Sequence, residues 1–234
     1  TSLAPACATG LIVIAPTPPG LASHLRLSIT AQPPATLAQF PSVFEDPRQC
    51  LQDVEARYMA SDSMAPALEI DDRFIIDKHT YRTDLPQRGD IVLYMLPPMA
   101  TVTLGVNPDA LLHRIVGLPG EVVAVREGQL YIDDQPLVEP YLSPPVPIDY
   151  DYGPETIPDD AYFVLGDNRN GSFDSHIWGM LPRDSILGFA IGIYCPAERQ
   201  IIFDPEAMSE KNQAIFGEVA AFFQENPAFC ALTE

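Results

Sequence analysis

Short apolar runs, each closed by Gly, Pro or Asp, recur through the middle of the chain. They are RFIID (73–77), IVLYML (91–96), LLHRIVGL (111–118), EVVAVREGQLYIDDQPL (121–137), AYFVLGD (161–167) and ILGFAIGIY (186–194). Runs of this length that are rich in β-branched and aromatic residues predict strands. The pairs Glu127-Gly128 and Asp133-Asp134 predict hairpin turns between them. The pattern therefore predicts a mainly β core.

The two ends of the chain differ from this core. Residues 1–55 are rich in Pro, Ala, Thr and Ser and show little periodicity, which predicts an extended arm. The core is expected over residues 56–203, and within it the Pro-rich, acidic segment 137–160 reads as a surface loop or ribbon. The chain holds 25 prolines, which favours short strands and rigid turns over long helices.

The tail, residues 204–234, predicts one C-terminal helix. Asp204-Pro205 resembles a helix start, with Asp as the cap and Pro in the first turn. Apolar residues then recur at helical spacing: they are Ile215, Val219, Phe222 and Phe223. This stripe is expected to pack on the core, with a partner surface as the alternative.

Charge and cysteine content exclude several classes of protein. The formal net charge of −19 argues against binding nucleic acid or anionic lipid, because both require basic side chains. No stretch is long and apolar enough to span a bilayer. Four scattered cysteines (Cys7, Cys50, Cys195 and Cys230) show no zinc-ligand spacing, and their pairing is left open.

Three blocks combine small, polar and turn-forming residues between the predicted strands. The first is SDSMAPAL (61–68), the second HRIVGLPGE (113–121) and the third GDNRNGSFDSHIWG (166–179). Together they supply serines, a histidine beside an arginine, and a carboxylate-rich loop. These are the components of a Ser-His-Asp hydrolase site.

The blocks resemble a known family. The first is similar to the SxSMxPTL motif of type I signal peptidases (S26-like serine peptidases), the second to their KRVVGLPGD and the third to their GDNRxNSxDSRxWG. RFIIDKHTYR and QRGDIVLY match in order and spacing, and the third block is most similar to cyanobacterial members. The resemblance covers residues 56–195. It implies a coiled antiparallel β-sheet core with a small β insertion at about 122–162.

The resemblance also assigns roles. Ser63 would be the nucleophile, and Ser61 would help to hold the oxyanion together with the Ser63 backbone N–H. His113 lies where bacterial members usually carry a lysine base, and imidazole can serve as a base near neutral pH. The archaeal and endoplasmic-reticulum branch also uses histidine there, with an aspartate to orient it, which corresponds to Asp174. Ser172 matches the hydroxyl that positions the bacterial lysine.

A substrate pocket for small side chains is implied as well. Its residues would be Met59, Ala60, Met64, Leu68, Leu111 and Leu112, which by composition alone would be ordinary core. A substrate would lie extended and add a strand beside them. No metal or other cofactor is expected. His24 and His79 are expected at the surface, Trp178 beneath the third block, and Asp167 and Arg169 as ties within it.

Two functions remain open at this point. The first is a non-catalytic homologue that serves as a binding or assembly subunit of a membrane-associated complex, such as a photosynthetic one. The second is an active serine endopeptidase that cleaves signal peptides after small residues (A-x-A). Three departures from the family favour the non-catalytic function: His176 replaces an arginine, Ala67 replaces a threonine, and the membrane anchor is missing. A LexA-like self-cleaving switch is a weaker third reading. The protein partner is expected on the extracytoplasmic side of a membrane, in the periplasm or thylakoid lumen.

Overall fold

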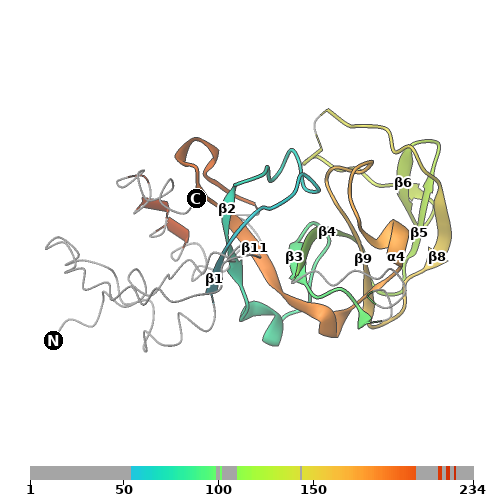
Figure 1. Cartoon of the computed structure of the whole chain (residues 1–234). Coiled ribbons are helices and arrows are strands. Elements are labelled where there is room, and N and C mark those ends of the chain that lie inside the picture. Colours follow the sequence, from blue (N-terminus) through green and yellow to red (C-terminus); the bar gives the residue numbers. More distant parts are fainter. Residues whose placement is uncertain are drawn as a thin grey trace, which may run out of the picture.

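The computed structural model describes residues 54–98, 101, 110–142, 144–203, 216, 217, 220, 221 and 224. Strands dominate the described residues, which confirms the mainly β prediction (Figure 1). The N-terminal arm up to residue 53, the predicted helix start at Asp204-Pro205 and the apolar stripe of the tail lie outside the described residues. So do three of the four cysteines, while Cys195 is disulfide-bonded.

The larger sheet is antiparallel and has eight strands in the order β1-β2-β11-β3-β4-β9-β10, with β12 paired to β11. Its strands are β1 (Val54–Tyr58), β2 (Arg73–Asp77), β3 (Ile91–Tyr94), β4 (Leu111–Gly117), β9 (Ala161–Leu165), β10 (Leu181–Pro182), β11 (Ile186–Cys195) and β12 (Ile201–Ile202). The long β11 pairs with both β2 and β3, and its register shifts at bulges. Bulges bend a strand, and in Figure 1 β11 curves beneath the other strands of this sheet.

The smaller sheet has four strands in the order β7-β6-β5-β8. They are β5 (Val122–Arg126), β6 (Gln129–Ile132), β7 (Gln135–Pro136) and β8 (Tyr152–Thr156). Both predicted hairpin turns are confirmed, because Glu127-Gly128 joins β5 to β6 and Asp133-Asp134 joins β6 to β7. All four turn residues have positive φ, as a tight two-residue hairpin requires.

One strand lies in the segment that the sequence predicts as a surface loop or ribbon. β8 falls inside the Pro-rich segment and pairs with β5. Its sequence, YGPET, has no apolar alternation, and four of its five residues are exposed. The strand forms because β5 offers a free edge, which no pattern within the segment itself reveals.

Helical structure is limited in the described residues. It comprises the short α4 (Ser175–Trp178) and three 3₁₀ turns, η1 (Thr80–Arg82), η2 (Arg183–Ser185) and η3 (Ala197–Arg199). In the tail, Phe216, Gly217, Ala220, Ala221 and Gln224 are helical. None of the helices described is long and apolar enough to cross a membrane.

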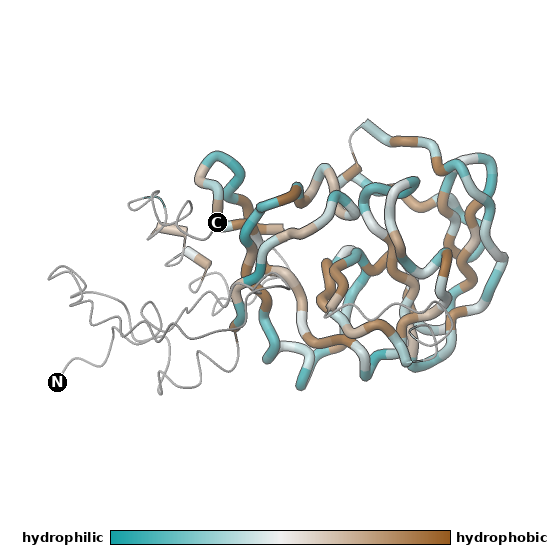
Figure 2. Tube along the Cα trace, viewed as in Figure 1, coloured by the Kyte–Doolittle hydropathy of each residue, from teal (hydrophilic) through white to brown (hydrophobic). Residues whose placement is uncertain are grey.

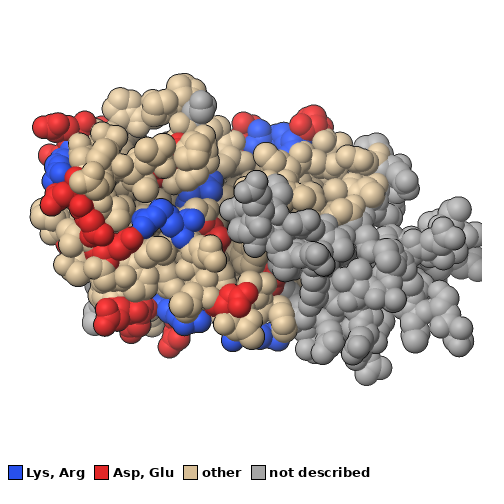
Figure 3. All heavy atoms as spheres, turned by 180° about the vertical axis from the view of Figure 1, so that it is seen from behind, with Lys and Arg blue, Asp and Glu red and all other residues tan. Residues whose placement is uncertain are grey.

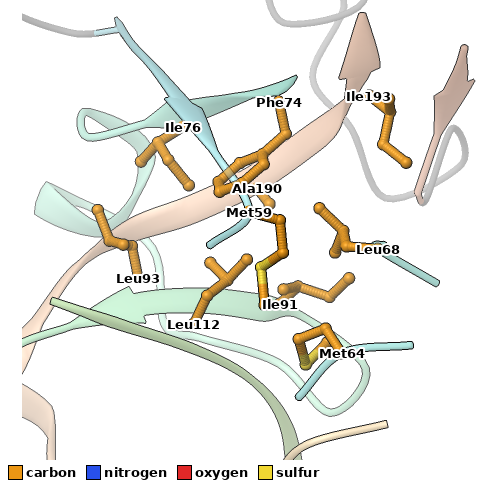
Figure 4. Close-up of a cluster of buried hydrophobic side chains, with 10 residues drawn as sticks. All are labelled: Met59, Met64, Leu68, Phe74, Ile76, Ile91, Leu93, Leu112, Ala190 and Ile193. Carbon is orange, nitrogen blue, oxygen red and sulfur yellow. The ribbon is translucent and has the colours of Figure 1, made fainter. Parts of the chain in front are cut away.

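The apolar side chains form four buried clusters, and Figure 2 shows the hydrophobic positions concentrated along the strands. One cluster lies between β1, β2, β3, β4 and β11, and Figure 4 shows its side chains pointing toward one another. A second lies within the smaller sheet and against β9. Phe216 of the tail is buried in a third, next to Ile75 and Tyr194.

The first cluster gives a direct test of the packing. Ile76 of β2 is fully buried. Ile76→Ala is expected to lower the free energy of unfolding by about 2–5 kcal/mol, because it removes apolar contacts and leaves a cavity. Ile70→Ala is the matched control, since Ile70 is 56% exposed and should change stability by less than about 0.5 kcal/mol. Equal effects in urea unfolding would contradict this packing.

Candidate active site

Ser63 lies in the turn that links β1 to β2. The base of this turn is closed by two backbone hydrogen bonds between Met59 and the Asp71-Asp72 pair, with N–O distances of 2.8 and 2.9 Å. Further on, Leu68 N–H donates to the Met64 carbonyl. Ser63 is only partly buried, and its Oγ lies 3.1 Å from Ser61 Oγ. The first block therefore presents two hydroxyls side by side on a fixed turn.

The third block packs directly on this turn. Asn168 N–H donates to the Ser63 carbonyl at 3.1 Å, and Asn168 Nδ2 donates to the Asp62 carbonyl at 3.2 Å. Gly166 allows the close approach, because a Cβ at that position would lie 2.4 Å from Ser63 O and 2.3 Å from Ser172 Cβ. Two segments about 100 residues apart in the chain are thus brought together at Ser63.

His113 lies on β4, between β3 and β9. It pairs with Val92 of β3, and the next residue, Arg114, pairs with Leu165 of β9. The side chain is 2% exposed. Burial lowers the pKa of His113 to about 4, against the opposing charges of Asp174 and Asp167. The imidazole is therefore uncharged at neutral pH, as a general base must be.

The hydrogen-bonding partner of His113 is a tyrosine. Tyr94 Oη lies 2.7 Å from His113 Nδ1, and both side chains are buried. Within the described residues, His113 Nε2 carries no hydrogen bond, and Ser63 Oγ bonds to Ser61 and not to His113. Tyr94 and His113 are adjacent on neighbouring strands, with ring centroids 5.9 Å apart.

Asp174 is fully buried and collects donors at the start of α4. Its carboxylate accepts from Gly166 N–H at 2.9 Å, from Ser172 Oγ, and from His176 N–H and Nδ1 at 3.1 and 2.6 Å. Burial favours the protonated form, but the hydrogen bonds from His176 and Ser172 and the nearby His113 hold the pKa of Asp174 below its usual value. Asp174 therefore acts on His113 through its charge, and the hydrogen bond on the His113 ring comes from Tyr94.

His176 forms the contact expected of the arginine that it replaces. A carboxylate only accepts hydrogen bonds, so His176 Nδ1 carries a proton toward Asp174. Its ring also stacks on Tyr150, with centroids 4.0 Å apart and planes 11° from parallel. This substitution keeps the pairing on the loop aspartate.

Asp167 and Arg169, which the sequence predicts as ties within the third block, join it mainly to other elements. Arg114 of β4 forms a bidentate pair with Asp167, with N–O distances of 2.9 and 2.6 Å. Arg169 donates to the Gly166 carbonyl at 3.0 Å. It also forms a bidentate pair with Glu139, in which both N–O distances are 2.6 Å. The Arg114 guanidinium also lies 3.9 Å from the ring centroid of Tyr141. Loop, strand and insertion are thus joined around the site.

The six predicted pocket residues do not all meet. Met59, Met64, Leu68 and Leu112 share the buried cluster of Figure 4. Leu111 packs instead on a different cluster, with Tyr94 and Val92, because neighbouring residues of a strand point to opposite faces. Ala60 is exposed at the turn. The apolar floor beside Ser63 is therefore built by the first four.

Sequence reasoning missed three residues of the site. Tyr94 reads as one more member of the apolar run 91–96, although a buried tyrosine needs a partner for its hydroxyl. Glu139 and Tyr150 lie in the Pro-rich segment, whose acidic and aromatic residues give no signal of which loop they contact. Only the tertiary contacts identify them.

The mainly β fold and the three sequence blocks are those of the signal peptidase class. The family profile described as "Signal peptidase, peptidase S26" matches residues 50–195. The chain belongs to this family, which confirms the resemblance drawn from the three blocks.

Individual relatives agree. Signal peptidase I of Leptolyngbya laminosa is 47% identical over 149 residues, which cover 62% of this chain and 70% of that protein. Probable signal peptidase I-2 of Synechocystis sp. is 44% identical, covering 67% of this chain and 70% of that protein. Probable thylakoidal processing peptidase 2 of Arabidopsis thaliana is 37% identical, covering 67% of this chain and 42% of that protein. A crystal structure of a signal peptidase I from Enterococcus faecalis matches at 32% identity, covers 45% of this chain and 97% of that chain, and has a TM-score of 0.37.

The close packing at Gly166 predicts a sensitive position. Gly166→Ala would force its Cβ against the Ser63 carbonyl, which is backbone and cannot swing away. We expect a loss of about 1–3 kcal/mol in the free energy of unfolding. Gly217→Ala is the control, because a Cβ there meets nothing within 4 Å. Urea unfolding with equal midpoints for the two variants would contradict the contact.

The burial of His113 predicts acid sensitivity. Its pKa falls from 6.5 to about 4 in the folded protein, so the unfolded chain binds the proton more tightly. The free energy of unfolding is therefore unaffected by His113 above about pH 6.5. It falls by about 3 kcal/mol as the pH drops from 6.5 toward 4, because only the unfolded chain takes up the proton. We expect His113→Gln to lose less stability than wild type between pH 7 and 4.5. Parallel pH profiles of unfolding for the two proteins would contradict a buried, neutral imidazole.

Proposed function

We propose that this protein is a serine endopeptidase that cleaves extended protein segments after small residues, with Ser63 as nucleophile and His113 as base. The observation that carries the proposal is the buried, uncharged imidazole of His113. His113 lies on β4, which pairs with β9. The loop that follows β9 contacts Ser63 through the hydrogen bond from Asn168 N–H to the Ser63 carbonyl. The cyanobacterial relatives, which are named signal peptidases, support the same activity.

No lysine is a competing base among the described residues. The whole chain contains two lysines, Lys78 and Lys211. Lys78 lies just after β2, and its Nζ is 3.2 Å from Glu55 Oε2. Lys211 lies outside the described residues. The proton of the Ser63 hydroxyl would therefore pass to a histidine in this member of the family.

The proposed reaction has two steps. Ser63 Oγ attacks the carbonyl carbon of the scissile bond while its proton moves to His113 Nε2, the nitrogen that Tyr94 leaves free. Ser61 Oγ and the Ser63 N–H would stabilise the oxyanion. The imidazolium then gives the proton to the leaving amine, and the buried charge of Asp174 favours this cation. Water cleaves the acyl-enzyme by the reverse sequence, while the hydroxyl of Ser172 holds Asp174 in place.

The substrate preference follows from the floor of the site. Met64 and Leu68 are fully buried beneath the Ser63 turn, and Leu112 is packed beside them. They share one buried cluster with Met59 and Ile91 (Figure 4), which favours a small side chain ahead of the cut. An A-x-A sequence supplies such a residue.

We place the protein on the extracytoplasmic side of a membrane, in the periplasm or thylakoid lumen. Cys195 is disulfide-bonded, and disulfides persist in oxidising compartments. Relatives named thylakoidal processing peptidases support a thylakoid membrane as the place of action. On the face in Figure 3, the basic side chains lie in separate groups among acidic ones, which favours a protein over a nucleic acid as partner.

A second candidate is a cleft that holds a peptide segment without cutting it, as in a binding subunit of a membrane-associated complex. Two contacts favour it. Ser63 Oγ is bonded to Ser61, and His113 Nδ1 is bonded to Tyr94. Neither hydrogen bond joins the Ser63 hydroxyl to the His113 ring. Both candidates use the same site and differ in whether the bond breaks.

Incubation with a pre-protein whose leader ends in A-x-A separates them. We expect wild type to release the mature protein and Ser63→Ala to lose at least about 10³-fold in rate, because no nucleophile remains. Ser61→Ala should retain part of the activity, since one oxyanion donor is left. Binding without cleavage by wild type and Ser63→Ala alike would support the second candidate and remove the first.

A further inference from the structure

Tyr94 is a buried tyrosine with a single polar neighbour. It ends β3, it is fully buried, and its ring packs against Trp178 with centroids 5.7 Å apart. Its Oη lies 2.7 Å from His113 Nδ1. In the part of the chain that the structure describes, this is the only hydrogen bond of the Tyr94 hydroxyl. The contact belongs to the site, but the three motif blocks do not include Tyr94.

The position of the shared proton follows from counting donors and acceptors. Burial and the charge of Asp174 raise the pKa of Tyr94, so the phenol keeps its proton. A buried hydroxyl that donates to nothing loses the free energy of a hydrogen bond without recovering hydration. A proton on His113 Nε2 carries less of this cost, because Nε2 is not among the buried polar atoms without a partner in the described residues and keeps contact with solvent. His113 Nδ1 is the one acceptor within reach among the described residues. Tyr94 therefore donates, and Nδ1 accepts with its lone pair.

This arrangement fixes the tautomer of His113. A neutral imidazole carries one proton, and if Nδ1 is the acceptor then the proton is on Nε2. We propose that Tyr94 is a positioning residue that holds His113 in the Nε2–H form. The free nitrogen of the ring then offers a donor instead of a lone pair. An Nε2–H group cannot take the proton of Ser63.

The proposal rests on the proposed peptidase function and adds a control step to it. Cleavage requires the other tautomer, with the proton on Nδ1 and the lone pair on Nε2. In that form Nδ1–H donates to Tyr94, whose own proton loses its acceptor. The resting protein would thus bind a segment with Nε2–H as a donor, and it would react only from the minor tautomer. Tyr94 slows the reaction without taking part in it.

Removal of the hydroxyl should release the ring. In Tyr94→Phe no donor faces Nδ1, so the preference for Nε2–H weakens. We expect kcat to rise by about tenfold, the factor that corresponds to one hydrogen bond of ordinary net strength, with KM unchanged. Tyr162→Phe is the matched control, because Tyr162 is buried in the same cluster but does not contact His113.

Nitrogen-15 NMR of the imidazoles tests the tautomer without any substrate. His113 is assigned by loss of its signals in His113→Gln, and circular dichroism checks that each variant folds. We expect the Nε2–H pattern at pH 7 in wild type and Tyr162→Phe, and a shift toward the Nδ1–H pattern in Tyr94→Phe. An Nδ1–H pattern in wild type, or no change in Tyr94→Phe, overturns the proposal.

The two hypotheses fail separately. If wild type does not cleave the A-x-A pre-protein, the peptidase function is lost, while the NMR pattern still decides the role of Tyr94. If cleavage depends on Ser63 and Tyr94→Phe lowers kcat or leaves it unchanged, the control step is wrong although the peptidase stands. A rise in kcat that Tyr162→Phe does not share, together with the tautomer shift, supports both.

Discussion

The site depends on the position of β4 between β3 and β9. The Arg114–Asp167 ion pair then joins β4 to the third block. Both partners are buried and joined by two hydrogen bonds. Removing one partner of such a pair typically costs about 3–5 kcal/mol, because an uncompensated charge stays buried. Neighbouring residues of a strand point to opposite faces. Arg114 can therefore hold the loop while His113 faces Tyr94.

The smaller sheet and its connecting segment act as a brace for this arrangement. Glu139 neutralises Arg169, Tyr141 covers Arg114, and Tyr150 stacks on His176. Each of these contacts reaches the Gly166–Gly179 block or the strand beside it. The insertion is thus a structural support for the loop that carries Asp174, in addition to any contact that it makes with a substrate.

In the proposed reaction, a histidine base differs from a lysine base in the physical effect that makes it neutral. A lysine must be strongly desolvated to become neutral, whereas His113 needs little help and is further depressed by burial. What histidine adds is a second nitrogen, and therefore a choice of tautomer. Tyr94 acts on that choice. The same buried environment that keeps the ring uncharged also makes an unpaired Tyr94 proton costly.

The sequence by itself determined the apolar strands of the core, both hairpin turns and the membership of the chain in the signal peptidase family. These features are local: apolar runs set strands such as β2 and β9, and paired turn residues set hairpins such as the one at Glu127-Gly128. The three blocks also indicated Ser63, His113 and Asp174 as candidate site residues. Only the tertiary structure decided that β8 pairs with β5, that Leu111 faces away from Leu112's cluster, and that Tyr94 is the partner of His113. Those outcomes depend on which distant edge or side chain is nearest after folding, and a hydrogen bond between two strands leaves no periodic trace in either one.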